Sequence, residues 1–416
     1  MHSKMPDSVP SPEHTERDSM TKSGKITRAE QATLLAQLDH FIDPQSGGVI
    51  PPINPATTYA RGDDYALPGH GGTYIRDEDP TVGQVEEVLA KLHGGPVETT
   101  DAFLFGSGMA GIAALFRAVT AEAGKQGHKA KLVIQRSMYF GTVKLAEMLE
   151  GGQSAEITWF DPSDLNTLAD ALGQKADLVW VETPSNPYLH VVDIAAVADA
   201  AHEAGALLAV DSTVAPPVLS QPLDHGADLI FHSATKSLNG HSDVLAGLLV
   251  TRAKDSSLWD AIRLERKLGG AVLNPFGAWL LGRGLRTLDL RAERSCASAL
   301  AVAEALQAHP KVNRVNYPGL ASHPGHDLAK QQMPGGFGSL MSFHVDGGAA
   351  AALALIDKLQ VIMAATSIGG PETLIEHRFT IEGPDYGAAE DLLRLSVGLE
   401  HADHLVADLI QGLDQI

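Results

Sequence analysis

The chain has 416 residues, of which 44% are hydrophobic, 20% charged and 5% aromatic, and its formal net charge is −20. This length predicts about two or three structural units, and the acidic charge disfavours binding to nucleic acid or to an anionic membrane surface. A single cysteine, Cys296, excludes a disulfide framework and a cysteine-rich metal site. No apolar run approaches the ~20 residues of a membrane span, and no secretion signal is evident, so we expect a cytoplasmic protein without a metal.

The N-terminal region is expected to be a tail followed by a helix and an arm. Residues 1–25 are rich in Ser, Pro and charge, which predicts a disordered tail. Thr27 and Glu30 have the spacing of a capping box, which predicts a helix start. The apolar residues expected to share one face of this helix are Leu34, Leu35, Leu38, Phe41 and Ile42. The Pro- and Gly-rich stretch that follows predicts an extended arm that wraps a neighbour, so residues 26–72 form the helix and arm.

Short apolar runs alternate with helix-length segments from about residue 100. This pattern predicts a seven-stranded, mainly parallel α/β sheet that is covered by helices on both faces. The expected strands are 102–105, 131–134, 156–160, 177–182, 206–211, 228–233 and 246–250. Later segments indicate a smaller α+β domain, with strands near 312–316, 339–345, 359–364 and 392–396 and helices near 297–308 and 403–415. The expected domains are a large one at 73–268 and a C-terminal one at 269–416.

The segment GSGMAG, at 106–111, follows the first expected strand and opens a helix. It matches the dinucleotide fingerprint, but the second strand ends in Gln135 and Arg136 instead of the acidic residue that would hold a ribose. Arg136 could accept a 2′-phosphate, so an NADP-dependent oxidoreductase stays open. The backbone amides of Gly108 and Met109 suit a smaller phosphate, and the alternative is a tight turn without a ligand.

A lysine and a carboxylate are expected at the same edge of the sheet. Lys236 follows the sixth strand in SATK, beside the hydroxyls of Ser233 and Thr235, and could form a Schiff base. Asp211 ends the fifth strand, and a carboxylate buried there needs a cation such as a protonated pyridine nitrogen. Taken singly, Lys236 could be a solvated loop lysine and Asp211 a helix cap. Together with the phosphate turn, they indicate a pyridoxal 5′-phosphate (PLP) site.

The sequence resembles the Cys/Met-metabolism family of PLP enzymes, which includes cystathionine γ-synthase, cystathionine β- and γ-lyases, methionine γ-lyase and the homoserine sulfhydrylases. The resemblance runs from about Pro51 to the C-terminus, through YIRDEDPTVGQVEEVLA, GSGMAG, ETPSNP, VDSTVAPP, SATKSLNGHSD and LRLSVGLE. It implies PLP fold type I, like that of aspartate aminotransferase, in which 73–268 is the PLP-binding domain. It also implies a homo-oligomer with shared active sites, usually a tetramer built as a dimer of dimers.

The resemblance also implies roles for the cofactor-binding residues. Lys236 matches the lysine that binds PLP covalently, and Asp211 matches the carboxylate that pairs with the pyridine nitrogen. Tyr74 and Arg76 match a pair that reaches the phosphate in the neighbouring subunit. The residues that match the phosphate cup are Gly108, Met109, Ser233 and Thr235.

Further residues match positions beside the cofactor ring and the substrate. Tyr139 matches the tyrosine that stacks on the ring and serves as general acid and base. Asn186 matches a residue near the phenolic oxygen, and Glu182 belongs to its supporting network. Ser367 and Arg394 match the residues that bind the α-carboxylate of the substrate, for which a planar guanidinium is well suited.

The sequence departs from the family pattern at three places. Methionine γ-lyases carry a reactive cysteine where Gly141 stands, so that activity is disfavoured. Asp79 replaces a common asparagine, although aspartate also caps helices. The segment LIEHRFTIEGP, at 374–384, differs from the family pattern at the expected substrate mouth.

The sequence therefore predicts a PLP-dependent γ-lyase that cleaves the γ-carbon bond to sulfur or oxygen in a homoserine or homocysteine derivative. Candidate substrates are cystathionine, an O-acyl-homoserine or a canavanine-like compound. The alternatives are γ-replacement of the cystathionine γ-synthase type and then a cystathionine β-lyase. The NADP oxidoreductase and a non-catalytic binding module are more distant alternatives.

Overall fold

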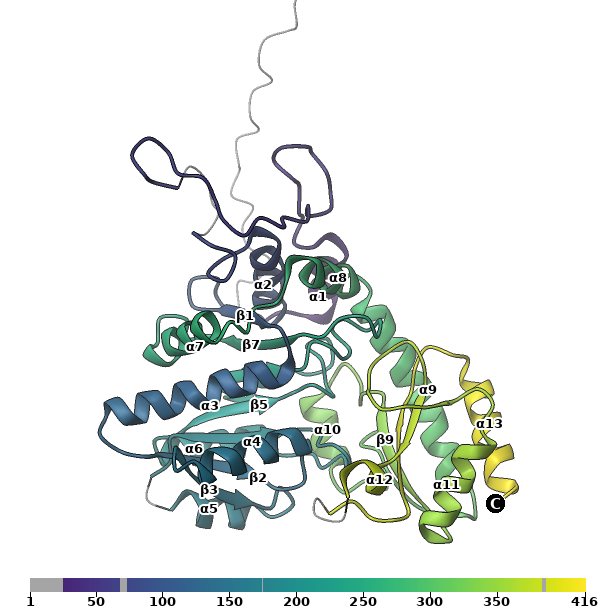
Figure 1. Cartoon of the computed structure of the whole chain (residues 1–416). Coiled ribbons are helices and arrows are strands. Elements are labelled where there is room, and N and C mark those ends of the chain that lie inside the picture. The colour runs from purple at the N-terminus through teal and green to yellow at the C-terminus, as the bar shows by residue number, and fades with distance from the viewer. Residues whose placement is uncertain (1–24, 68–72, 174, 384–386) are drawn as a thin grey trace, which may run out of the picture.

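The computed structural model describes residues 25–67, 73–173, 175–383 and 387–416. Most of the expected tail and residues 68–72 of the expected arm therefore lie outside the described residues. Two sheets organise the described chain: the larger has an apolar core on each face, and the smaller has a core of its own (Figure 1). No helix in the described ranges is long and apolar enough to cross a membrane.

The larger sheet has seven strands in the order β1-β7-β6-β5-β4-β2-β3. Only β7 runs antiparallel to its neighbours, so the prediction of a mainly parallel seven-stranded sheet is confirmed. The strands are β1 (Asp101–Phe105), β2 (Ala130–Gln135), β3 (Ala155–Phe160), β4 (Leu178–Glu182), β5 (Leu207–Asp211), β6 (Leu229–His232) and β7 (Gly247–Thr251). Because the parallel strands share one direction, the segments that follow β1, β2, β4, β5 and β6 emerge at one edge of the sheet.

Helices cover both faces of this sheet, because successive strand residues point to opposite sides. On β4, Val179 and Val181 enter one core, whereas Leu178 and Trp180 enter the other. The first core is closed by α2 (Pro80–Leu92), α5 (Leu165–Leu172), α6 (Ile194–Glu203) and α8 (Pro275–Leu285). The second is closed by α3 (Gly108–Lys125), α4 (Phe140–Gly151) and α7 (Ser257–Gly269). A short 3-10 helix, η1 (Pro222–His225), precedes β6.

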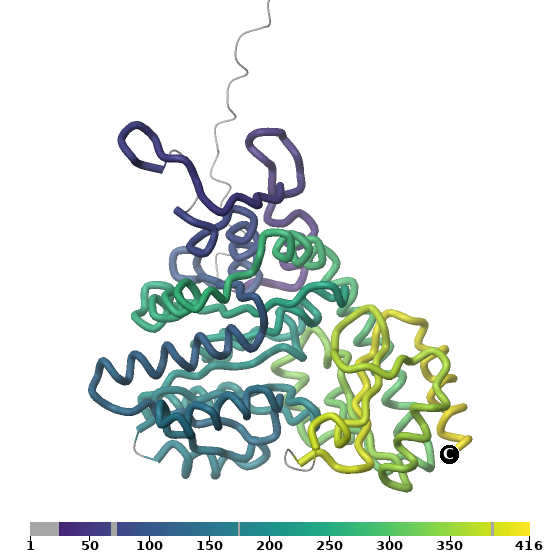
Figure 2. Tube along the Cα trace, viewed as in Figure 1, coloured from purple at the N-terminus to yellow at the C-terminus, as the bar shows by residue number. Residues whose placement is uncertain are grey.

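The N-terminal helix α1 (Arg28–Gln37) begins at the expected capping box but ends earlier than expected. The Thr27 amide donates to the Glu30 carboxylate at 2.7 Å, and the Glu30 amide donates to the Thr27 hydroxyl. Leu38 takes a left-handed conformation that ends the helix, so the expectation that Phe41 and Ile42 share its face is wrong. The physical reason is that this turn buries Leu38 while Ile42 stays 54% exposed. Figure 2 shows the purple arm looping out beyond α2 and α8.

The smaller sheet has five strands in the order β10-β11-β12-β9-β8. Helices α9 (Leu288–Ala308), α11 (Gly348–Lys358) and α13 (Ala402–Asp414) pack against one of its faces. The remaining elements are β8 (Val312–Asn316), α10 (His326–Gln332), β9 (Leu340–Val345), β10 (Met363–Ala364), β11 (Leu374–His377), α12 (Arg378–Glu382) and β12 (Leu392–Ser396).

Three elements in this domain differ from expectation. Helix α9 begins at Leu288, nine residues before the expected start, because its polar first turns bury few side chains and give a weak apolar pattern. The strand expected at 359–364 is only two residues long. The sequence pattern does not predict strand β11, because its residue Glu376 is charged and faces away from the apolar core.

Two buried histidines link α2 to the end of β6. The Nε2 atoms of His93 and His232 lie 3.1 Å apart, and Nδ1 of His93 lies 2.8 Å from the Leu89 carbonyl oxygen. That carbonyl can only accept, so His93 carries its proton on Nδ1 and His232 donates to its Nε2. Burial, with the nearby Arg252 guanidinium, lowers the pKa of His93 to about 4, and burial lowers the pKa of His232 well below its ordinary value.

This pair predicts a loss of stability in mild acid. An unfolded histidine takes up a proton near pH 6.5, whereas folded His93 does so only near pH 4, so stability falls as the pH drops between these values. Denaturant titrations at pH 7.5 and at pH 5.5 measure how much the free energy of unfolding falls between these two pH values. This fall should be smaller in His93→Gln than in the parent by about 1 kcal/mol. The exposed His404→Gln is the control. An equal drop in His93→Gln and the parent would contradict a neutral pair.

Candidate active site

A cavity of about 560 Å³ is lined by residues of both domains. It brings together eleven of the residues singled out from the sequence. These are Gly108, Met109, Tyr139, Glu182, Asn186, Asp211, Ser233, Thr235, Lys236, Ser367 and Arg394. Tyr74 and Arg76 do not line it; the Arg76 guanidinium lies 5.1 Å from the Tyr74 ring centroid, and Tyr74 pairs with Thr58 in the arm.

The sheet topology explains how residues distant in sequence meet here. Asp211 and Glu182 end two adjacent parallel strands, β5 and β4, and lie directly opposite each other in register. Ser233 follows β6, and Gly108 begins α3 after β1. Ligand sites of open α/β sheets lie at this carboxyl edge of the strands.

Asp211 and Glu182 are two carboxyls in a nearly dry environment, with exposed fractions of 4% and 3%. Burial raises the pKa of both, and the negative charge of Asp211 raises that of Glu182 further. Backbone amides hold the Glu182 carboxylate, with the Tyr139 amide at 2.9 Å and the Asn186 amide at 2.6 Å. Asp211 accepts from the Thr213 amide at 2.9 Å. Glu182 thereby fixes the backbone of two other cavity residues.

The start of α3 forms a cradle with little room for a side chain at Gly108. A Cβ atom there would lie 3.1 Å from the Ser233 hydroxyl and 3.3 Å from the Phe231 ring. The Ser233 amide donates to the Thr213 hydroxyl at 2.8 Å, which ties the end of β6 to that of β5. The positive end of a helix and a hydroxyl thus face one space, an arrangement that suits a phosphate group.

Lys236 reaches across the cavity to the smaller domain. Its Nζ atom donates to the Ser367 hydroxyl at 3.0 Å. Burial, with the nearby Arg394 guanidinium, lowers the pKa of Lys236. Ser367 has a backbone φ of 112°, which is unusual for a residue with a side chain and costs about 1–3 kcal/mol. The structure therefore holds Ser367 in a strained conformation at the cavity wall.

Arg394 faces the cavity because strand residues alternate. Its neighbours Leu393 and Leu395 enter the core of the smaller domain, so the guanidinium points to the opposite face. It donates to the Asn186 side-chain oxygen at 2.9 Å and to the Ser367 carbonyl at 3.2 Å. It also pairs with Glu376 at 2.8 Å. Burial lowers the pKa of Arg394 to about 10, although Glu376 opposes this shift.

Sequence reasoning missed five polar residues of the cavity. The residues that line it without having been assigned are Ser107, Thr213, Thr366, Glu376 and Arg378. Thr213 stands in the quoted segment VDSTVAPP, two residues after Asp211, and its side chain could have been assigned to the same edge. Glu376 and Arg378 belong to the segment that departs from the family pattern, and no local signal places them. Arg136, the basis of the NADP alternative, lies 5.7 Å from the Trp159 ring centroid and does not line the cavity.

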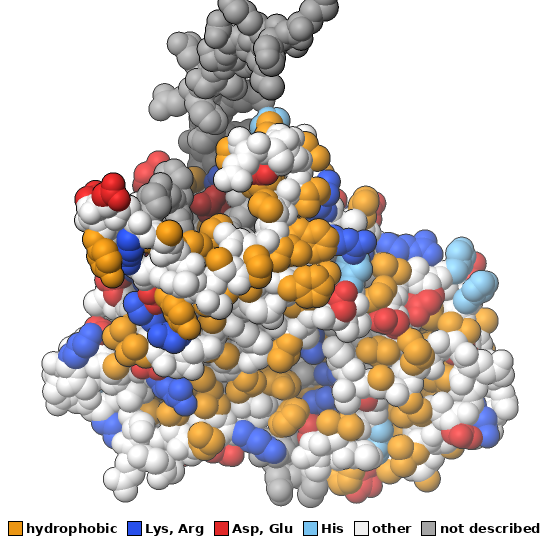
Figure 3. All heavy atoms as spheres, turned by 45° about the horizontal axis from the view of Figure 1, so that its top comes forward, with side chains coloured by type: hydrophobic (Ala, Val, Ile, Leu, Met, Phe, Trp, Pro, Cys, Tyr) orange, Lys and Arg blue, Asp and Glu red, His pale blue; other side chains and the backbone are white. Residues whose placement is uncertain are grey.

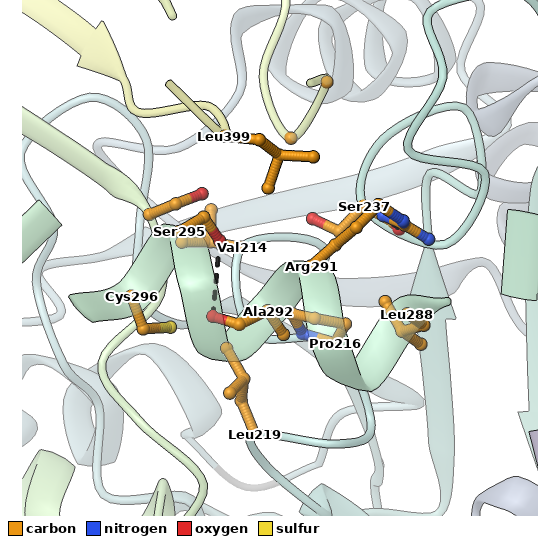
Figure 4. Close-up of a pocket in the computed structure, with 13 residues that line it drawn as sticks. Val214, Pro216, Leu219, Ser237, Leu288, Arg291, Ala292, Ser295, Cys296 and Leu399 are labelled. Atoms are coloured by element: carbon orange, nitrogen blue, oxygen red, sulfur yellow. Dashed lines mark hydrogen bonds between the residues drawn. The ribbon is translucent and has the colours of Figure 1, made fainter. Parts of the chain in front are cut away.

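A second cavity beside α9 is too small for a substrate. Its volume is about 20 Å³, which is room for about one water molecule. Figure 4 shows Cys296, Ser295 and Arg291 around it. Burial raises the pKa of Cys296 to about 11, so the thiol stays protonated and is a poor nucleophile. Arg291 donates to the carbonyl of Ser237 at 2.8 Å and so anchors the loop that carries Lys236.

Comparisons with known proteins agree with this geometry. A family model described as Cys/Met metabolism PLP-dependent enzyme matches residues 32–414. Cystathionine gamma-synthase of Mycobacterium tuberculosis is 39% identical over 396 residues, which cover 94% of this chain and 97% of that protein. L-methionine gamma-lyase of Fusobacterium nucleatum is 36% identical over 414 residues, which cover 95% and 100%.

A solved structure shows the same fold. Cystathionine gamma synthase of Xanthomonas oryzae superposes with a TM-score of 0.85 at 38% identity, covering 94% of this chain and 98% of that one. The predicted fold type I is confirmed, and the oxidoreductase alternative is not supported. The match over nearly the whole length establishes that this chain belongs to the Cys/Met metabolism family of PLP-dependent enzymes.

Proposed function

We propose that this chain is a PLP-dependent γ-lyase. It cleaves the bond between the γ-carbon and a sulfur or oxygen substituent of a homoserine- or homocysteine-derived amino acid, and it releases ammonia and a 2-oxo acid. The observation that carries the proposal is one cavity that holds a lysine with a lowered pKa, a buried carboxyl and a buried arginine. These residues are Lys236, Asp211 and Arg394.

The residues present fit PLP. The cradle at Gly108, the start of α3 and the hydroxyls of Ser233 and Thr235 would hold the phosphate. Asp211 would pair with the protonated pyridine nitrogen, a cation that offsets the cost of burying its charge. Lys236 would bind the cofactor covalently. When bound, PLP supplies an electron sink that stabilises negative charge at the substrate α-carbon.

The protein's own residues would bind the substrate and move its protons. Arg394 binds the α-carboxylate through two parallel hydrogen bonds, beside Ser367. Lys236 removes the α-proton, and its lowered pKa favours the neutral amine that this step needs. Tyr139 accepts a proton from the incoming amine and donates one to the leaving group, and Glu182 holds its backbone in place.

A second candidate is γ-replacement, in which an added thiol takes the place of the leaving group. It is favoured by the name of the Mycobacterium tuberculosis relative, a cystathionine gamma-synthase. The surroundings of Gly141 count against a methionine γ-lyase. A Cβ atom at Gly141 would lie 2.5 Å from Cε1 of Tyr139 and 3.1 Å from Sδ of Met109, so a cysteine there would displace the tyrosine.

We further propose that the active sites are shared between subunits of a homo-oligomer, at least a dimer and in this family usually a tetramer. Tyr74 and Arg76 lie outside the cavity of their own chain, where they can serve a neighbour's phosphate. The arm also exposes large apolar residues, with Val49 66% and Tyr65 79% exposed. Figure 3, in which the top of Figure 1 is turned toward the viewer, shows hydrophobic side chains spread over the face that it presents. A partner subunit would cover them. The cytoplasmic location stays a prediction from the sequence.

The reaction type can be tested by product analysis. With cystathionine, an O-acyl-homoserine or canavanine as the single substrate, the enzyme should release ammonia and a 2-oxo acid without an added thiol. Lys236→Ala should abolish turnover and the borohydride-reducible link to the cofactor, because no other cavity residue supplies an amine at that position. Product formation only with added cysteine, without ammonia, would establish γ-replacement instead. Full activity of Lys236→Ala would contradict the PLP mechanism.

The packing around Tyr139 predicts a penalty at Gly141. Gly141→Ala should lower kcat/KM by about 5- to 150-fold, because overpacking that displaces a side chain costs about 1–3 kcal/mol. Gly151→Ala is the matched control, since it lies on the same helix and its Cβ meets nothing within 4 Å. Equal kcat/KM values in the two variants would show that the Tyr139 ring is not fixed by Gly141.

Shared sites predict complementation between inactive subunits. Lys236→Ala and Arg76→Ala proteins, mixed and reassembled, should regain partial activity, because one site of a mixed dimer then carries neither lesion. A mixture of Lys236→Ala with Asp211→Ala should stay inactive, because both residues belong to one chain's cavity. Equal recovery in both mixtures, or none in either despite subunit exchange, would contradict sharing through Arg76.

Arg394→Lys tests geometry at constant charge. Charged hydrogen bonds contribute about 1.5–3 kcal/mol, so losing the planar fork should lower kcat/KM by about 10- to 150-fold. The melting temperature and the visible absorbance of the cofactor should change little. A large fall in melting temperature with unchanged kcat/KM per folded molecule would make Arg394 a structural residue.

A further inference from the structure

Two guanidinium groups share one carboxylate oxygen at the wall of the cavity. Glu376 on β11 and Arg394 on β12 are register partners, and Arg378 begins α12 directly after β11. Oε1 of Glu376 lies 2.8 Å from Arg394 and also contacts Nη1 of Arg378. All three side chains line the cavity, and each is less than one-tenth exposed.

Arg378 has a second carboxylate of its own. Glu382 lies four residues later on α12, and its side chain is 2% exposed and paired with Arg378. Two buried cations and two buried anions therefore balance. Buried charges are tolerated only when they are paired, so removing Arg378 would leave Glu376 dependent on Arg394 and Glu382 without its counter-ion.

This sharing decides how strongly Glu376 competes with a substrate. The other hydrogen bonds of Arg394 go to neutral oxygens of Asn186 and Ser367, so Glu376 is its anionic partner among the described residues. A substrate carboxylate that binds Arg394 must displace Glu376 or share the guanidinium with it. Glu376 can yield at small cost when Arg378 remains as its counter-ion.

We propose that Arg378 is a positioning residue that holds Glu376 and thereby leaves Arg394 free to bind the α-carboxylate of the substrate. The inference rests on the proposed function, in which Arg394 binds that carboxylate. The inference gives a role to the segment that departs from the family pattern. Arg378, which pairs with Glu382 within α12, attracts Glu376 and thereby weakens the interaction of Glu376 with Arg394.

Binding of glycine tests this separately from γ-chemistry, because glycine has the α-amino and carboxylate groups but no γ-substituent. The double variant Arg378→Met/Glu382→Gln removes one positive and one negative charge and leaves Arg394 as the guanidinium that pairs with Glu376. In the cofactor-loaded enzyme, titration of the visible absorbance with glycine should give a Kd about tenfold higher, as expected when a buried carboxylate loses one of two charged partners. KM for the reactive amino acid should rise in parallel, while kcat changes less than about threefold.

Adding Glu376→Gln to the double variant should bring the glycine Kd back to within about twofold of the parent, because the competing carboxylate is then gone. Arg263→Met/Asp260→Asn removes an exposed ion pair on α7 and is the matched control. If the double variant does not fold, the single variant Glu382→Gln replaces it as the test. Arg378 then has Glu376 as its remaining anionic partner, so glycine should bind no more weakly than in the parent.

The outcomes separate this inference from the proposed function. If Arg394→Lys leaves the glycine Kd unchanged, Arg394 does not bind the carboxylate and both fail. If Arg394→Lys weakens glycine binding but the folded double variant does not, the role of Arg378 is wrong and that of Arg394 stands. Weaker binding in the double variant that Glu376→Gln does not reverse, or weaker binding in Glu382→Gln, also overturns the inference.

Discussion

Asp211 and Glu182 lie opposite each other at the ends of two parallel strands, in a part of the molecule that water barely reaches. Each carboxyl would cost several kcal/mol to bury as an isolated ion. The protein meets that cost in two ways. Backbone amides of Tyr139, Asn186 and Thr213 donate to the carboxyl oxygens, and the adjacent cavity leaves room for a cationic ring. The same interactions fix Tyr139, Asn186 and Thr213, which line the cavity.

The smaller domain completes the site with side chains that meet those of the large domain across the cavity. Arg394 crosses to Asn186 of the large domain at 2.9 Å, and Lys236 of the large domain crosses to Ser367 at 3.0 Å. Both contacts bridge segments more than 130 residues apart in sequence. The shape of the cavity therefore depends on how the two sheets face each other, and the ion pairs around Glu376 form part of its wall.

Support for the site extends behind the sheet. Arg291 anchors the backbone after Lys236, and the His93–His232 pair sits directly before Ser233. None of these three supporting side chains lines the cavity. These interactions are buried and require a fixed protonation state. Protonation of the histidine pair in acid would therefore disturb the end of β6, next to Ser233, without any change in the residues that line the cavity.

The sequence by itself determined the elements whose signals are local. Seven buried strands are visible as apolar runs, the Thr27–Glu30 capping box marks the start of α1, and Asp79 caps α2 as expected. Residues at strand ends can also be assigned to one edge, because parallel strands deliver their carboxyl ends to the same side. This is why the sequence alone groups Lys236 with Asp211, and both side chains line the same cavity.

Only the tertiary structure decided the contacts between distant segments. β11 is a strand with a charged residue inside it, and its polarity is satisfied by Arg394 on the neighbouring strand and by Arg378 on the next helix. Nothing in the local pattern of 374–384 indicates this, since a carboxylate inside a strand is favourable only once its partners are in place. The distinction is physical: apolar periodicity reports burial within an element, whereas the balance of buried charges depends on which elements the fold brings together.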